Sequence, residues 1–173
     1  MIVTERISEV HNEDCMIGMA RYPDKWFDLA VVDPPYGIGA GNRRGDTGKN
    51  KHIKQKEYKY GDWDSNAPDA IYFKEVSRVS KNQIIWGGNY FDLSPTSCYL
   101  VWNKKNGENL YADCELAWTS FDTAVRMFEY RWFGFLQENH GKDKENRIHP
   151  TQKPVALYDW IYKNYLPQGG KVI

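Results

Sequence analysis

Cysteine is scarce in this sequence, and the three cysteines present lie far apart. Cys15, Cys98 and Cys114 form no C-x-x-C pair, so their spacing indicates neither a disulfide framework nor a zinc site. Long apolar runs are also missing, since none approaches the roughly 20 residues that a membrane-spanning helix needs. No signal-peptide pattern follows Met1. We therefore expect a soluble, cytoplasmic protein with no membrane partner and no metal site.

The chain also lacks an excess of charge of either sign. Its 23 Lys and Arg balance its 23 Asp and Glu, so the net charge does not indicate a nucleic-acid partner. A length of 173 residues, of which 41% are hydrophobic and 15% aromatic, is enough for one domain over residues 1–173. Evidence for a function must come from motifs and from the distribution of charge.

Residues 42–60 form a polar stretch in which basic side chains are concentrated. Seven Lys and Arg stand there against two acids, and this composition predicts a basic flexible loop that contacts phosphates. Loops of this kind are often disordered when free and become ordered on binding. A solvated loop without a ligand is the alternative. The side chains that we expect to contact double-stranded DNA are Arg43, Arg44, Lys49, Lys51, Lys54 and Lys56.

Strands and helices alternate along the chain as in an α/β protein. Apolar runs predict strands over 27–32, 83–86 and 98–102, and amphipathic spacing predicts helices over 13–21, over 68–81 and from 154 onward. A strand, a helix and a strand in succession form a crossover, which makes the first two strands parallel. Segments 115–118 and 124–130 alternate across a short turn, and they predict an antiparallel hairpin.

The strand over 27–32 ends in the tetrapeptide Asp33-Pro34-Pro35-Tyr36. Two successive prolines cannot continue a sheet ladder, so the strand stops and displays a carboxylate, a carbonyl and a flat ring. The Asp33 carboxylate and the Pro34 carbonyl can each accept one N–H of an exocyclic amino group, while Tyr36 stacks on the ring that carries it. Holding both hydrogens localises the nitrogen lone pair and makes the amine a nucleophile. A strand followed by a turn without chemistry is the alternative.

This tetrapeptide resembles the catalytic motif of the amino-group DNA methyltransferases, which methylate adenine N6 or cytosine N4 with S-adenosyl-L-methionine. Residues 12–15 are similar to the acidic cofactor motif of that family, and residues 149–154 to the segment before the cofactor-binding half in its circularly permuted, beta-type branch. The resemblance implies a Rossmann-like, mostly parallel sheet with an antiparallel hairpin at one edge. It also implies base flipping, with a catalytic set of Asp33, Pro34, Pro35 and Tyr36.

The resemblance further implies a set of cofactor-binding residues, namely Asp14, Asp33, His149, Gln152 and Lys153. Asp14 would contact the nucleoside, and Lys153 at a helix start would attract the methionine carboxylate. The alternative for Asp14 is an acid that complements the helix dipole. The alternative for residues 149–153 is a helix cap with surface polar side chains.

The sequence departs from the family pattern at its C-terminal end. Residues 166–173 lead into the first strand of a cofactor-binding half, but the glycine-rich turn and the ribose-binding acid do not follow before Ile173. We therefore expect a sheet that is incomplete at this end, weak or no cofactor binding, and self-association through the uncovered edge. Adenine N6 methylation is the first interpretation of function. Cytosine N4 methylation and an inactive DNA-binding remnant of such an enzyme are the alternatives.

Overall fold

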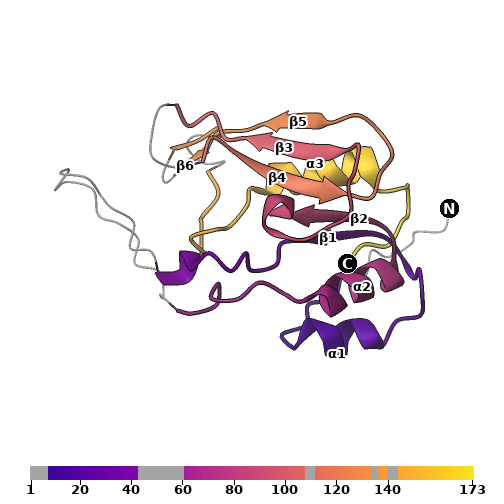
Figure 1. Cartoon of the computed structure of the whole chain (residues 1–173). Coiled ribbons are helices and arrows are strands. Elements are labelled where there is room, and N and C mark those ends of the chain that lie inside the picture. The colour runs from indigo at the N-terminus through magenta and orange to yellow at the C-terminus, as the bar shows by residue number, and fades with distance from the viewer. Residues whose placement is uncertain (1–7, 43–60, 108–111, 134–135, 140–143) are drawn as a thin grey trace.

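The chain folds into an α/β domain in a computed structural model, which describes residues 8–42, 61–107, 112–133, 136–139 and 144–173 (Figure 1). The predicted basic loop, with Arg43, Arg44, Lys49, Lys51, Lys54 and Lys56, lies outside the described residues. In chain order the elements are α1 (Cys15–Ala20), β1 (Phe27–Val32), α2 (Ala70–Val79), β2 (Ser80–Trp86), β3 (Tyr99–Asn103), β4 (Cys114–Thr119), β5 (Arg126–Glu129), β6 (Trp132–Phe133), β7 (Leu136–Gln137) and α3 (Val155–Tyr165).

Five strands form one sheet in the order β1-β2-β4-β3-β5 (Figure 1). β1 pairs with β2 in parallel, and β3 pairs with β5 in parallel. β4 lies between β2 and β3 and runs antiparallel to both. The sheet is therefore mixed, and the prediction of a mostly parallel sheet is wrong at this level of detail. The architecture is compatible with a Rossmann-like α/β fold.

The predicted hairpin between segments 115–118 and 124–130 is also wrong in its pairing. Both segments form strands, but β5 pairs with β3 and not with β4. Beyond the end of β4, the Ser120 N–H donates to the Gln83 carbonyl and the Ser120 Oγ accepts from the Gln83 N–H, which prolongs contact with β2. β5 exposes Arg126, Met127 and Glu129, and charged side chains suit the edge position that it occupies. The antiparallel pair of this region is β3 with β4.

Helices cover both faces of the sheet (Figure 1). On one face, buried side chains of α3 pack against alternate residues of β1 to β4. On the other face, Met19 of α1 and Val76 and Val79 of α2 pack against β1. Successive residues of β1 point to opposite faces, so Leu29 lies in the first cluster and Ala30 in the second. No helix among the described residues is long and apolar enough to cross a membrane.

The C-terminal segment lies along the edge of β1 that faces away from β2. Val172 bridges Leu29 in parallel, the Val31 N–H donates to the Ile173 carbonyl at 2.8 Å, and the Ile173 N–H donates to the Leu29 carbonyl at 3.1 Å. β1 therefore has a hydrogen-bonded neighbour on each side. The carboxyl end of β1, where the tetrapeptide begins, is placed between those two neighbours.

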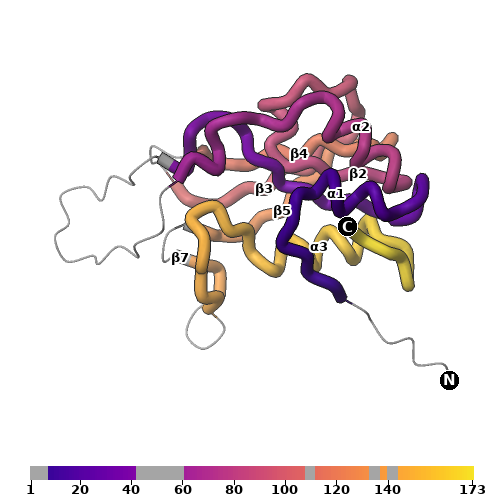
Figure 2. Tube along the Cα trace, turned by 90° about the horizontal axis from the view of Figure 1, so that it is seen from below, coloured from indigo at the N-terminus to yellow at the C-terminus, as the bar shows by residue number. Residues whose placement is uncertain are grey.

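The segment before α3 is held by the small antiparallel sheet of β6 and β7 (Figure 2). Gln137 in β7 donates through Nε2 to the Glu145 carbonyl and accepts through Oε1 from the Glu145 N–H, both at 2.9 Å. The Glu145 carboxylate in turn accepts from the Val155 N–H at 3.1 Å, one of the donors that a helix start leaves without a partner. These contacts fix the start of α3, and with it Lys153.

Candidate functional site

The tetrapeptide places one carboxylate at the carboxyl end of β1. The Asp33 side chain is 31% exposed, whereas Pro34 is buried. The Tyr36 hydroxyl donates to Asp33 Oδ1 at 2.8 Å. Burial raises the pKa of Tyr36, and the negative charges of Asp33 and Glu115 raise it further. Tyr36 is therefore a neutral phenol, and it remains a donor to Asp33 at every pH at which the protein would work.

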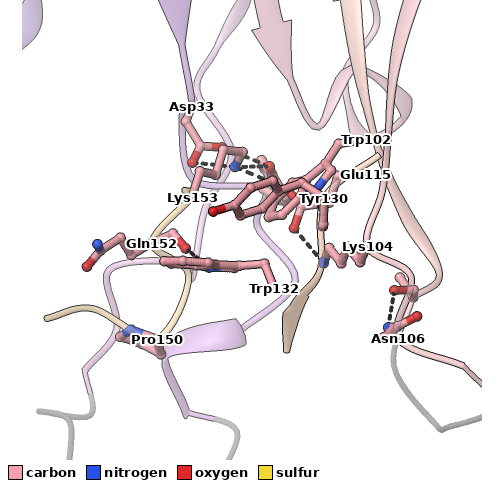
Figure 3. Close-up of polar contacts among 12 residues, drawn as sticks. Asp33, Trp102, Lys104, Asn106, Glu115, Tyr130, Trp132, Pro150, Gln152 and Lys153 are labelled. Carbon is pink, nitrogen blue, oxygen red and sulfur yellow. Dashed lines mark hydrogen bonds and ion pairs between the residues drawn. The ribbon is translucent and has the colours of Figure 1, made fainter. Parts of the chain in front are cut away.

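Lys153 brings a buried positive charge to the same carboxylate. Its Nζ lies 2.6 Å from Asp33 Oδ2, 3.1 Å from Glu115 Oε2 and 3.4 Å from the Tyr36 hydroxyl (Figure 3). The Lys153 side chain is 2% exposed. A buried ammonium needs polar partners. Lys153 donates hydrogen bonds to Asp33 and to the Tyr36 hydroxyl, and Glu115 adds an ion pair. Lys153 is therefore held by the ends of β1 and β4 together.

Glu115 in β4 connects Lys153 to a second lysine. Its Oε1 lies 2.7 Å from Lys104 Nζ, and its Oε2 faces Lys153 (Figure 3). Burial alone would raise the pKa of Glu115, but the positive charges of Lys153 and Lys104 outweigh burial and hold it below its ordinary value of 4.5. Glu115 is thus ionised at neutral pH. Lys104, Glu115, Lys153 and Asp33 form a row of charges that alternate in sign, which we call the charge row.

Two further aromatic rings extend the surface around Tyr36. Tyr90 stacks on Tyr36 with ring centroids 5.0 Å apart and planes 17° apart, and Phe91 meets Tyr36 edge-on at 6.0 Å. Tyr90 is 48% exposed. Gly87, which precedes this turn, has a left-handed φ of 72°, and a Cβ there would lie 2.3 Å from the Tyr36 ring. Gly87 thus leaves the room in which the Tyr36 ring packs.

A buried acid fixes the loop that follows the tetrapeptide. Asp64 is 2% exposed, and its carboxylate accepts hydrogen bonds from the N–H groups of Tyr36 at 2.5 Å, Gly37 at 3.1 Å and Ala40 at 2.8 Å. The Asp64 carbonyl also accepts from the Gly39 N–H at 3.0 Å. Successive N–H groups that converge on one anion form a nest. Here the anion is a side chain of the protein, and it holds Tyr36 in place through the backbone.

The predicted cofactor residues are only partly brought together. His149 meets the ring of Trp63 edge-on at 5.1 Å, and Gln152 Oε1 accepts from the Ile148 N–H at 2.7 Å. Both therefore make contacts within or beside the turn before α3. Of residues 149–153, Lys153 is the one that contacts Asp33. Lys153 donates to Asp33 and to Tyr36, and the expected contact of residues 149–153 with the cofactor carboxylate stays a prediction.

Asp14 is the N-cap of α1. Its Oδ1 accepts from the Met16 N–H at 2.7 Å, which is the capping role that helix-start acids perform. The side chain is exposed. Burial raises the pKa of Tyr72, and charge on Cys15 and on Asp33 raises it further, so the start of α1 and Asp33 both act on one tyrosine. Asp33 thus lies within electrostatic reach of Tyr72, as does the start of α1 at Cys15.

Four residues of this site were not predicted from the sequence: Lys104, Glu115, Asp64 and Tyr90. Tyr90 had a usable signal, because it follows β2 as Tyr36 follows β1, and the carboxyl ends of parallel neighbours meet at one edge. Lys104 and Glu115 meet because β3 pairs with β4, which the predicted hairpin did not include. No pattern marked Asp64, which belongs to a polar turn cluster in the sequence.

Comparisons with known proteins add no assignment, since no protein-family model matches the chain and no curated protein does. Among the described residues, no three His, Cys, Asp or Glu side chains gather as metal ligands. The three cysteines are free thiols. A function for the site must therefore be argued from the residues themselves.

Proposed function

We propose that this chain is the catalytic part of an amino-group DNA methyltransferase, which transfers a methyl group from S-adenosyl-L-methionine to adenine N6 in DNA. The observation that carries the proposal is the Asp33 carboxylate, held at the end of β1 by Tyr36 and Lys153. It stands beside an aromatic pair, Tyr36 and Tyr90, of which Tyr90 is half-exposed. A fixed acceptor beside a ring surface is what an amino group on a planar heterocycle requires.

Asp33 acts as the acceptor for the amino group. Each of its carboxylate oxygens takes one hydrogen bond from the protein, and a carboxylate oxygen can accept two. Each oxygen of Asp33 therefore keeps one position. One of these takes an amino N–H, and the Pro34 carbonyl is the acceptor for the other hydrogen. With both hydrogens held, the lone pair is localised on the nitrogen and is directed at the methyl carbon.

The methyl donor supplies an electrophilic methyl group on a sulfonium cation. Asp33 is the acid of the site whose charge suits that cation. Asp14, which caps α1, keeps its expected contact with the nucleoside of the donor. His149, Gln152 and Lys153 keep their expected place beside its carboxylate, and in the structure Lys153 also holds Asp33.

One feature supports DNA as the substrate. The residues that flank the predicted basic loop lie together, because the Gly61 N–H donates to the Gly41 carbonyl at 3.3 Å, and Asp64 accepts from the Tyr36 N–H of the tetrapeptide. We therefore assign the basic residues between Gly41 and Gly61 to contacts with the phosphates of a DNA strand bound at the tetrapeptide.

The test is transfer of labelled methyl from S-adenosyl-L-methionine to unmethylated duplex DNA, followed by nucleoside analysis. We expect label in N6-methyladenine from the parent chain and no label from Asp33→Ala. Asp159→Ala, a change at an exposed acid of α3, is the matched control and should keep the parent activity. Label in N4-methylcytosine would assign the other amino group. No label from a folded parent chain would refute the proposed activity.

A further inference from the structure

One buried ammonium stands between two carboxylates from different elements. Lys153 Nζ is 2.6 Å from Asp33 after β1 and 3.1 Å from Glu115 in β4 (Figure 3). Asp33 is partly exposed, whereas Lys153 is almost fully buried. Asp33 is therefore accessible on one side and paired with Lys153 on the other. Glu115 pairs with Lys153 as well and has no role in the chemistry described so far.

The strength with which Lys153 attracts Asp33 depends on Glu115. Charges interact strongly in a site with little water, and Lys153 divides its attraction between the two carboxylates. If Glu115 lost its charge, Lys153 would pair with Asp33 alone and would stabilise the negative charge of Asp33 more strongly. If Lys104 were removed, Glu115 would be less neutralised and would draw Lys153 away from Asp33. Neutralising Glu115 thus strengthens the attraction between Lys153 and Asp33, and removing Lys104 weakens it.

The tyrosines around Asp33 do not disturb this balance. Tyr36, Tyr72 and Tyr158 all lie within electrostatic reach of Asp33. Burial is the largest cause that raises the pKa of each, and the Asp33 charge adds to it, after Cys15 in the case of Tyr72. All three are neutral at neutral pH, because their ordinary pKa of about 10 is already high. The charges that act on Asp33 within the charge row are those of Lys153, Glu115 and Lys104.

We propose that Glu115 is a positioning residue that acts through Lys153, sharing its ammonium with Asp33 and so keeping Asp33 a strong acceptor for the substrate amino group. The catalytic part of this inference rests on the proposed function. The electrostatic part is that Glu115 and Lys104 alter the strength of the ion pair between Lys153 and Asp33. It rests on the contacts alone. A purely structural ion pair would hold the strands together without changing the properties of Asp33.

The electrostatic part is tested by carbon NMR of labelled aspartate in the full chain at pH 7, which follows the carboxyl resonance of Asp33. Glu115→Gln keeps the shape of the side chain, and Glu115→Gln and Lys104→Met should shift this resonance in opposite directions. Lys153→Met should shift it in the same direction as Lys104→Met and by more, because Lys153 is the nearer cation, and Lys153→Arg should restore it towards the parent position. Glu129→Gln, at an exposed residue of β5, is the control and should leave it unchanged.

The catalytic part is tested by kinetics of methyl transfer in the same variants. Glu115→Gln should lower kcat at least tenfold and leave the KM for DNA within about twofold, because the substrate surface is intact while the acceptor is weaker. An Asp33 carboxyl resonance at the same position in the parent, Glu115→Gln and Lys104→Met would overturn the inference whatever the activity. Shifted resonances with a parental kcat would overturn its catalytic part. Shifted resonances in a chain that transfers no methyl group would refute the proposed function and leave standing the electrostatic effect of Glu115 and Lys104 on Asp33.

Discussion

Asp33 Oδ2 and Lys153 Nζ form an ion pair of 2.6 Å although 120 residues separate them in the chain. The contact joins the carboxyl end of β1 to the start of α3, the helix that covers one face of the sheet. Because the Lys153 side chain is 2% exposed, this pair is part of the folded interior as well as part of the candidate site. The same contact therefore bears on stability and on function.

Lys153→Met should destabilise the fold strongly. It leaves the buried Oε2 of the half-buried Glu115 without its cation, and removing one partner of a buried pair costs about 3–5 kcal/mol. Urea unfolding at pH 7 measures the difference. Lys163→Met, at an exposed position of α3, is the matched change and should stay within about 0.5 kcal/mol of the parent. Equal, small effects of both changes would contradict the burial of Lys153.

The sequence was sufficient to locate β1, α2, β2 and the edge at which the tetrapeptide stands. An apolar run that ends in two prolines leaves few alternatives, and a strand, helix and strand in succession fix a parallel pair. The position of β4 could not be predicted in the same way. Its neighbours follow from tertiary packing, in which the little-exposed β4 becomes interior and the charged β5 becomes an edge.

The sequence predicted the site residues that lie close together in the chain. It missed those that only the order of strands in the sheet brings to the site. Asp33 and Tyr36 are close in sequence, and their hydrogen bond follows from one turn of the chain. Glu115 reaches Lys153 because β4 is inserted beside β2, so no short-range pattern signals it. Asp14 shows the opposite case: helix capping explains its observed contact, and its expected role towards a cofactor stays a prediction.

Asp64→Asn should loosen the loop after the tetrapeptide. An amide in place of the carboxylate removes the charge and turns one acceptor into a donor, which faces N–H groups of Tyr36, Gly37 and Ala40. Hydrogen bonds to a charged group contribute about 1.5–3 kcal/mol each, so we expect a loss of at least about 2 kcal/mol. Hydrogen exchange of those three amides should become at least tenfold faster.

Asp69→Asn is the control for that experiment. Asp69 also accepts from two backbone N–H groups, those of Ile71 and Tyr72, as the N-cap of α2. Asparagine caps helices about as well as aspartate, so this variant should lose only a few tenths of a kcal/mol and should leave the exchange at Tyr36 unchanged. If both variants behaved alike, the carboxylate of Asp64 would not be what holds the loop.

Gly87→Ala should lower the free energy of unfolding by more than the left-handed backbone at this position alone explains. An alanine there carries the left-handed penalty of about 1–2 kcal/mol, and its Cβ would lie 2.3 Å from the Tyr36 ring, which adds about 1–3 kcal/mol of overpacking. Gly169→Ala separates the two effects, because Gly169 has a φ of 73° with no atom within 4 Å of an added Cβ. Unfolding in urea should show the larger loss for Gly87→Ala, and an equal loss would place the Tyr36 ring elsewhere.

Acid should reduce the contribution of Glu115 to stability in a defined pH range. The folded-state pKa of Glu115 lies below its ordinary value of 4.5, since the charges of Lys153 and Lys104 outweigh burial. A depressed pKa of an acid stabilises the fold above pH 4.5, and that stabilisation is lost as the pH falls through the folded-state value. The difference in free energy of unfolding between the parent and Glu115→Gln should therefore be largest at pH 7 and shrink below pH 4.5.

Urea unfolding of both proteins at pH 7, 5, 4 and 3 measures this difference, and each unit of depression corresponds to about 1.4 kcal/mol. Other acids, such as Asp28 with its pKa lowered by hydrogen bonds from Lys81 and Lys171, are present in both proteins and cancel. Thr119→Val in the same strand removes a buried hydrogen bond to the Cys98 carbonyl but no titrating group, so its cost should be the same at every pH. A cost of Glu115→Gln that stayed equally constant would mean that the pKa of Glu115 is the same in the folded and the unfolded chain, and that the cations of the charge row do not stabilise its charge.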